Sequence, residues 1–166
     1  VNFKREYFSS HPAQVMVFRF SADKKAALRG KISMGNEHEI PILADNGTLV
    51  MKGDTGKFWW WQVHLREPKR LLGSREYASD KNIDLDFEAQ VRVLHEGGTV
   101  KKVDNTMVFE NCDSVTLLLA ADTNYLNQRD KGWRGPHPHE RLSAQIAAAE
   151  KRPYADLLHE HVEDKS

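Results

Sequence analysis

Residues 85–121 read LDFEAQVRVLHEGGTVKKVDNTMVFENCDSVTLLLAA, and this stretch decides the fold of the chain. Its first part alternates apolar and polar residues, which is the pattern of a β-strand with one buried face. The pair Gly97-Gly98 then predicts a hairpin. The last apolar residues fill both faces of a strand, which places that strand in the centre of a sheet. The strands predicted by this stretch cover residues 85–93, 99–103, 106–110 and 114–121.

The residues on the N-terminal side of this stretch predict more strands of the same kind. Asn46-Gly47 accepts the positive φ angles of a type I′ turn, so we expect a hairpin there. Pro12 lacks an N–H and suits a connection between two strands. Strands are predicted over 3–9, 14–20, 28–34 and 58–65, and the polar residues 66–83 are predicted to form an inserted loop.

The pattern becomes helical towards the C-terminus. Residues 127–138 are polar, with two glycines and two prolines, and predict a loop. Apolar residues then recur at helical spacing over 139–151, and Pro153 suits the first turn of a second helix. We therefore predict a mainly β protein. An antiparallel two-sheet β-sandwich covers 1–126, and a loop and helices cover 127–166.

The composition is that of one soluble globular domain. The 166 residues include 24 basic and 24 acidic side chains, and 40% are hydrophobic. Because the net charge is zero, we expect no nucleic-acid partner, and no apolar run is long enough to span a membrane. Cys112 is the one cysteine, so no internal disulfide can form. The sequence has no glycine motif for a phosphate or dinucleotide, and we expect no cofactor.

The histidines near the C-terminus raise the question of a metal site. Pro138 separates His137 from His139, and with one cysteine in the chain no clear cluster of further ligands accompanies this pair. His159 and His161 are two residues apart on a predicted helix, whereas zinc-binding helices use an i, i+4 spacing. We therefore favour structural histidines and predict no metal ligand.

Two other groups of residues could carry chemistry. Asp84, Asp86 and Glu88 share one face of a predicted strand. We expect this face to be solvated, without the burial that tunes a catalytic acid, and we predict no catalytic residue there. Trp59 and Trp61 share a face of another predicted strand and could stack on sugar rings. We favour packing for these two residues, with weak carbohydrate binding as the alternative.

The chain contains three stretches that carry a family resemblance: FKREYFSSHPAQVMVFRFSAD (3–23), LDFEAQVRVLHEGGTVKKVDNTMVFENCDSVTLLLAADTNY (85–125) and PHPHERLSAQIAAAEKRPYADLLHEHVED (136–164). In the same order, these stretches resemble glycoside hydrolase family 95, the family of inverting α-L-fucosidases and related α-L-galactosidases. Thr123–Tyr125 resembles the family's Thr-x-Tyr element, and Pro138-His139 resembles its Pro-His pair before a helix. Tyr154, Leu157 and His161 follow its Tyr-x-x-Leu-x-x-x-His pattern.

The resemblance implies a role for the chain. It identifies these residues with the second half of the family's N-terminal β-domain, a partial supersandwich, and with linker helices that lead to a catalytic (α/α)6 barrel outside this sequence. The family's catalytic residues lie on that barrel. We therefore expect an inverting α-L-fucosidase-type parent and an inactive fragment. Tyr154, Leu157, His161 and His139 are expected to hold the linker helices in place.

The expected partners follow from the same resemblance. They are the catalytic barrel of the parent chain and glycans that contain fucose or galactose, and the resemblance implies a secreted or periplasmic parent. Without the rest of the parent, we expect exposed apolar side chains to drive self-association. Trp59, Trp61 and Leu157-Leu158 are the expected contributors. The alternatives are an independent carbohydrate-binding β-sandwich that uses Trp59 and Trp61, and a cell-surface interaction domain without sugar specificity.

Overall fold

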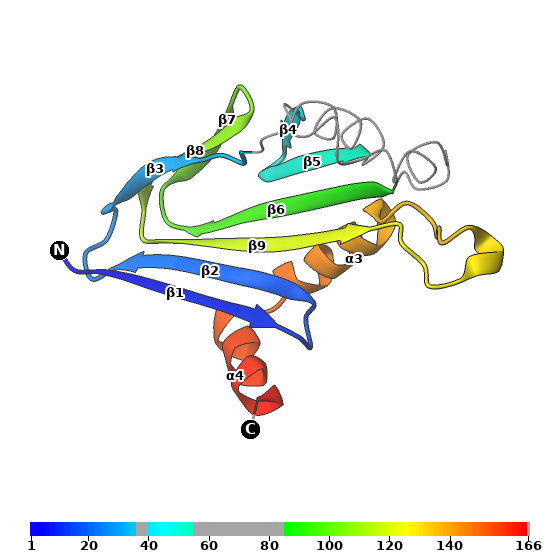
Figure 1. The fold of residues 1–166 in the computed structure, drawn as a ribbon. Coiled ribbons are helices and arrows are strands. Elements are labelled where there is room, and N and C mark those ends of the chain that lie inside the picture. Colours follow the sequence, from blue (N-terminus) through cyan, green and yellow to red (C-terminus); the bar gives the residue numbers. More distant parts are fainter. Residues whose placement is uncertain (36–39, 55–84, 166) are drawn as a thin grey trace, which may run out of the picture.

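The fold consists of two antiparallel sheets and a pair of C-terminal helices (Figure 1). The computed structural model describes residues 1–35, 40–54 and 85–165. Within these residues, a six-stranded sheet and a three-stranded sheet are followed by both helices. This arrangement confirms the predicted fold class. The strand predicted over 58–65 and the loop predicted over 66–83 lie outside the described residues.

The large sheet has the strand order β1-β2-β9-β6-β5-β4. β9 lies between β2 and β6, which confirms the central position that its apolar faces predict. The turn between β4 and β5 has positive φ angles at Asn46 (43°) and Gly47 (77°), which confirms the predicted hairpin. The strands are β1 (Phe3–Ser10), β2 (Val15–Ala22), β4 (Ile42–Asp45), β5 (Thr48–Asp54), β6 (Asp86–Glu96) and β9 (Ser114–Thr123).

The small sheet packs on one face of the large sheet. It consists of β3 (Leu28–Ile32), β8 (Thr106–Cys112) and β7 (Thr99–Val103), in that spatial order. The thiol of Cys112 is fully buried between the sheets, and burial raises its pKa. The buried apolar residues of this first core are Leu28, Ile42, Ala44, Leu49, Val91, Val93, Met107, Cys112 and Val115.

The helices cover the opposite face of the large sheet (Figure 1). α3 spans His139–Glu150 and α4 spans Tyr154–Asp164, close to the helices that the sequence predicts. A short 3-10 helix, η1 (Arg129–Lys131), lies in the loop between β9 and α3. Neither described α-helix is long and apolar enough to cross a membrane. The second core joins strands and helices through Val15, Val17, Leu118, Ala120, Leu142, Ile146, Ala149 and Leu157.

The large sheet is therefore packed on both of its faces, by the small sheet on one side and by the helices on the other. The helices share a core with the strands, so their position depends on the side chains that β2 and β9 present to them. The division between residues 1–126 and 127–166 that the sequence suggests stays a prediction.

Candidate functional site

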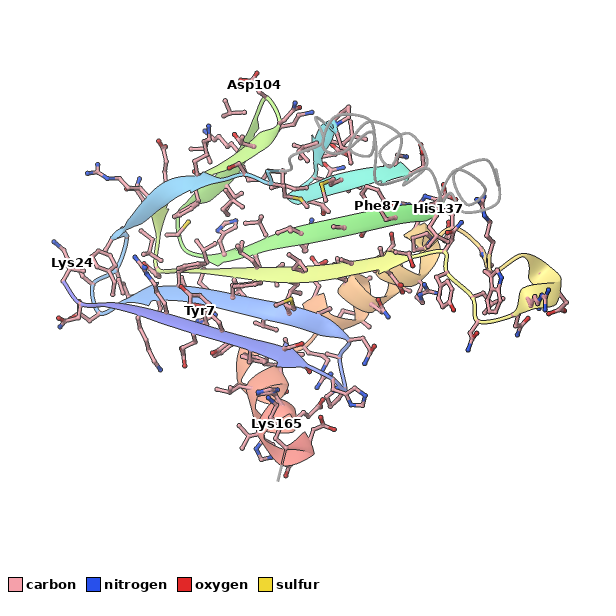
Figure 2. The ribbon with its side chains drawn as sticks, viewed as in Figure 1. Tyr7, Lys24, Phe87, Asp104, His137 and Lys165 are labelled. Carbon is pink, nitrogen blue, oxygen red and sulfur yellow. The ribbon has the colours of Figure 1, made fainter. Side chains whose placement is uncertain are left out.

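Polar and aromatic side chains gather at one end of the large sheet, where β6 begins and β9 ends. The chain leaves β9 here, passes through the loop 124–138 and enters α3. Figure 2 labels Phe87, at the start of β6, and His137, near the end of the loop, close to each other at this end of the sheet. We call this region the loop end of the large sheet.

Glu88 is buried at the loop end, with 1% of its surface exposed. The expectation that its strand face is solvated is wrong, because α3 packs on this face. The register places Gln90 opposite Ala120 of β9, and Ala120 belongs to the core shared with α3. Asp86 is half-buried, and Asp84 lies outside the described residues.

The Glu88 carboxylate is held by donors from β6 and α3. Its Oε1 accepts hydrogen bonds from Gln90 Nε2 at 2.6 Å and from His139 Nδ1 at 2.8 Å. Gln90 Nε2 also donates to Ser143 Oγ at 3.0 Å, so the network joins the strand to the first turns of the helix. These donors offset the cost of burying the charge, and the N-terminal end of a helix dipole favours a carboxylate nearby.

His137 binds the start of the helix rather than the carboxylate. Its Nδ1 accepts a hydrogen bond from the backbone N–H of His139 at 3.2 Å, which requires an unprotonated Nδ1. That atom then has no proton to donate to Glu88 Oε2, which lies 3.8 Å away and has no hydrogen-bond partner among the described residues. In the described part of the chain, no group of three or more His, Cys, Asp or Glu is placed to hold a metal ion.

The two carboxylates that face each other at the loop end both have cationic or hydrogen-bonding partners. Asp122 lies directly opposite Glu88 in the register of β6 and β9. Arg141 Nε donates to Asp122 Oδ2 at 2.8 Å, as His139 does to Glu88. Inverting hydrolysis needs an acid and a base on opposite sides of a bond, with room for a water molecule. Glu88 and Asp122 instead lie side by side beside α3, an arrangement suited to holding the helix.

Asn124 anchors the loop 124–138 to the start of β6. Its side chain accepts a hydrogen bond from the Asp86 N–H at 3.0 Å and donates one to the Asp86 carboxylate at 2.8 Å. Its own N–H donates to the Asp86 carbonyl at 3.0 Å. The Gly135 N–H donates to the Asn124 carbonyl at 2.6 Å. The loop therefore leaves and returns at a fixed point on the sheet.

Tyr125 and Trp133 form an exposed ring pair in this loop. Their ring planes are parallel to within 1° and the ring centroids are 6.5 Å apart. Tyr125 is 53% exposed and Trp133 is 43% exposed. The sequence patterns indicated Tyr125 only as part of a family element and assigned no role to Trp133. The sequence did contain one indication of this exposed ring pair, which is a tryptophan inside a polar loop that contains glycines.

The remaining site residues that the sequence predicts lie on α4, against β1 and β2. Phe8 stacks on His161 with ring centroids 5.0 Å apart and contacts Tyr154 at 5.9 Å. The Arg19 guanidinium lies 4.7 Å from the Tyr154 ring centroid, and burial raises the pKa of Tyr154. Leu157 is 2% exposed. The expectation that Leu157 contributes to an exposed patch is therefore wrong, because this side of α4 packs into the second core.

Comparison with known proteins adds the decisive observation. Residues 1–128 match the sequence model of the family described as Glycosyl hydrolase family 65, N-terminal domain. The chain belongs to this family. It is also 26% identical, over an alignment of 180 positions that includes gaps, to the protein named Alpha-L-fucosidase 2 from Arabidopsis thaliana.

These findings confirm that the chain is a glycosyl hydrolase N-terminal domain with a fucosidase relative. The alignment covers 99% of this chain and 20% of the relative, so the chain spans about a fifth of the length of that protein. The family match ends inside the loop at residue 128, whereas the alignment spans nearly the whole chain. The family match of this glycosyl hydrolase N-terminal domain thus stops at the loop end of the large sheet, inside the loop 124–138.

A double-mutant cycle tests the contact between Glu88 and His139 in this glycosyl hydrolase N-terminal domain. His139→Ala leaves a buried carboxylate with one donor fewer, so we expect the free energy of unfolding to fall by about 1–2 kcal/mol. In a Glu88→Gln background no charge is left uncompensated, and we expect His139→Ala to cost less than about 0.5 kcal/mol. Urea denaturation of the four proteins measures the coupling. Equal costs in both backgrounds would show that the two side chains do not interact.

Proposed function

We propose that this glycosyl hydrolase N-terminal domain is non-catalytic and supports the catalytic barrel of a fucosidase-type glycoside hydrolase. The observation that carries the proposal is the alignment with Alpha-L-fucosidase 2, which covers 99% of this chain but 20% of that protein. Most of such a relative therefore lies outside the part that this chain matches, and it has room for a separate catalytic domain.

The side-chain contacts at the loop end support the proposal. A general acid and a general base must exchange protons with substrate and water, so both need access to them. Glu88 is buried against Gln90 and His139, and Asp122 is bound by Arg141. These contacts hold α3 on the sheet, which is a structural task.

The exposed apolar side chains of β1 and β2 offer a surface for the rest of the parent chain. Tyr7, labelled in Figure 2, is 54% exposed and contacts Phe18 and Phe20 with ring centroids 5.6 and 5.9 Å apart. Phe3 and Met16 are also exposed, and the register places them on the same sheet face as Tyr7. An uncovered patch of this kind favours association, so we propose that the isolated chain self-associates through it.

Turnover of a chromogenic aryl α-L-fucoside tests the proposed function. We expect purified residues 1–166 to release no chromophore and the longer parent enzyme to hydrolyse the substrate. In the parent, Glu88→Gln keeps the shape of the side chain and is expected to leave kcat within about twofold, because this carboxylate takes no part in the chemistry.

Three outcomes would contradict the proposal in different ways. Turnover by the isolated chain would overturn the non-catalytic role. A large loss of kcat in the parent carrying Glu88→Gln, with an unchanged thermal midpoint, would place Glu88 in the reaction. An inactive parent would remove the fucosidase-type assignment while leaving the family membership intact.

The alternative is an independent carbohydrate-binding β-sandwich. Trp59 and Trp61, the residues first considered for this role, lie outside the described residues. Among the described residues, the exposed ring pair Tyr125–Trp133 favours sugar binding. Sugar binding by the isolated chain, together with an inactive parent, would favour this alternative over the supporting role.

A further inference from the structure

We propose that Tyr125 and Trp133 form a platform that binds the ring of a pyranose sugar. The proposal takes its class of ligand, a carbohydrate, from the alternative function given above. It does not require a contact with a catalytic barrel. It is argued from two exposed parallel rings, from a backbone that holds Trp133 in an unfavourable conformation, and from hydrogen-bond donors on the neighbouring Arg134.

The ring pair matches the apolar side of a sugar. A pyranose ring carries C–H groups on one face and hydroxyl groups around its rim. The face of an aromatic ring has a negative quadrupole and attracts such C–H groups, while burial of both surfaces removes apolar area from water. About half of Tyr125 and of Trp133 is open to solvent, and their parallel planes give both rings a common orientation.

The backbone at Trp133 is strained. Its φ angle is 63°, in the left-handed region that bulky side chains rarely adopt. Two hydrogen bonds hold this conformation, from the Trp133 N–H to the Gln128 carbonyl at 3.0 Å and from the Leu126 N–H to the Trp133 carbonyl at 2.9 Å. Strained positions of this kind concentrate at functional sites. The position of this exposed ring is therefore a feature that stability alone does not explain.

Arg134, which follows Trp133 in the chain, carries side-chain hydrogen-bond donors without an acceptor among the described residues. It forms an isolated β-bridge with Tyr125. Its Nε and Nη2 are shielded from solvent and have no hydrogen-bond partner among the described residues. Unsatisfied buried donors are uncommon in folded proteins. A sugar hydroxyl would provide the missing acceptor after rotation of the Arg134 side chain, and the Asn124 anchor keeps the platform in place before binding.

NMR titration with methyl α-L-fucopyranoside tests the platform. The indole N–H signal of Trp133 is identified by its loss in Trp133→Phe. We expect this signal to shift with sugar concentration and to saturate, with a Kd in the millimolar range that is typical of a small ligand with few contacts. Sorbitol has hydroxyl groups but no ring face, and we expect it to cause no saturable shift.

Ring-deletion variants then separate binding from folding. We expect Tyr125→Ala and Trp133→Gly each to weaken binding at least about tenfold, measured by saturation transfer to the sugar. Tyr7→Ala is the matched control, because Tyr7 is 54% exposed but lies on β1, and it should bind like the unmodified chain. Glycine accepts a positive φ, so Trp133→Gly should unfold at the same or a higher temperature although it binds less sugar.

The outcomes distinguish this proposal from the proposed function. An active parent whose isolated domain binds no sugar would overturn the platform and leave the supporting role. Binding that survives in Trp133→Gly, or that falls equally in Tyr7→Ala, would also overturn it. A large drop in the thermal midpoint of Trp133→Gly, with no sugar binding by the unmodified chain, would assign the ring pair to stability.

Discussion

Replacing Gly98 with alanine is expected to lower the free energy of unfolding by about 3 kcal/mol or more. Gly98 lies in the turn between β6 and β7 with a φ angle of 58°. A Cβ at this position would lie 2.5 Å from the Asn111 carbonyl carbon and closer still to the Glu110 carbonyl oxygen. Both contacts are with backbone, so neither can be relieved by rotating a side chain. The substitution would push β7 away from β8 within the small sheet.

Gly132→Ala is the matched control for this substitution. Gly132 also has a positive φ, 63°, but apart from Gly132 and its two chain neighbours no described residue has an atom within 4 Å of the position of a Cβ. Its replacement therefore measures the conformational cost alone, which we expect to be about 1 kcal/mol. Urea denaturation of both variants gives the difference. Equal losses would mean that the backbone at Asn111 moves away easily and that the close approach does not constrain the turn.

Leu118→Ala is expected to lower the free energy of unfolding by about 2–5 kcal/mol. Leu118 is fully buried on β9, the central strand, and packs in the core that joins the large sheet to the helices. The truncation leaves a cavity next to α3 and removes part of the surface on which this helix rests. We therefore also expect faster hydrogen exchange of the amide groups in α3.

Leu43→Ala is the control for the same chemical change at an exposed site. Leu43 is 54% exposed on β4, an edge strand of the large sheet, and its truncation should change stability by no more than about 0.5 kcal/mol. Chemical denaturation and hydrogen exchange compare the two variants directly. If Leu118→Ala costs no more than Leu43→Ala, the helices do not pack on the sheet in solution as described.

The sequence alone predicted the local elements well. Alternation with a period of two located strands such as β6, and the apolar residues of β9 on both faces predicted its central position. Asn46-Gly47 predicted the β4–β5 hairpin because few other residue pairs accept two positive φ angles. The spacing of apolar residues predicted both helices. Each of these features depends on residues that are close together in the chain.

Tertiary structure alone decided what covers each surface. Alternation shows that Glu88 and Gln90 share a strand face, but whether that face meets water or α3 depends on contacts across about 50 residues of chain, so the sequence wrongly indicated a solvated carboxylate. Leu157 is buried for the same reason. The pairing of Tyr125 with Trp133 depends on backbone hydrogen bonds that close a loop. Because the residues of this loop show no periodic pattern, its sequence does not predict which of them come together.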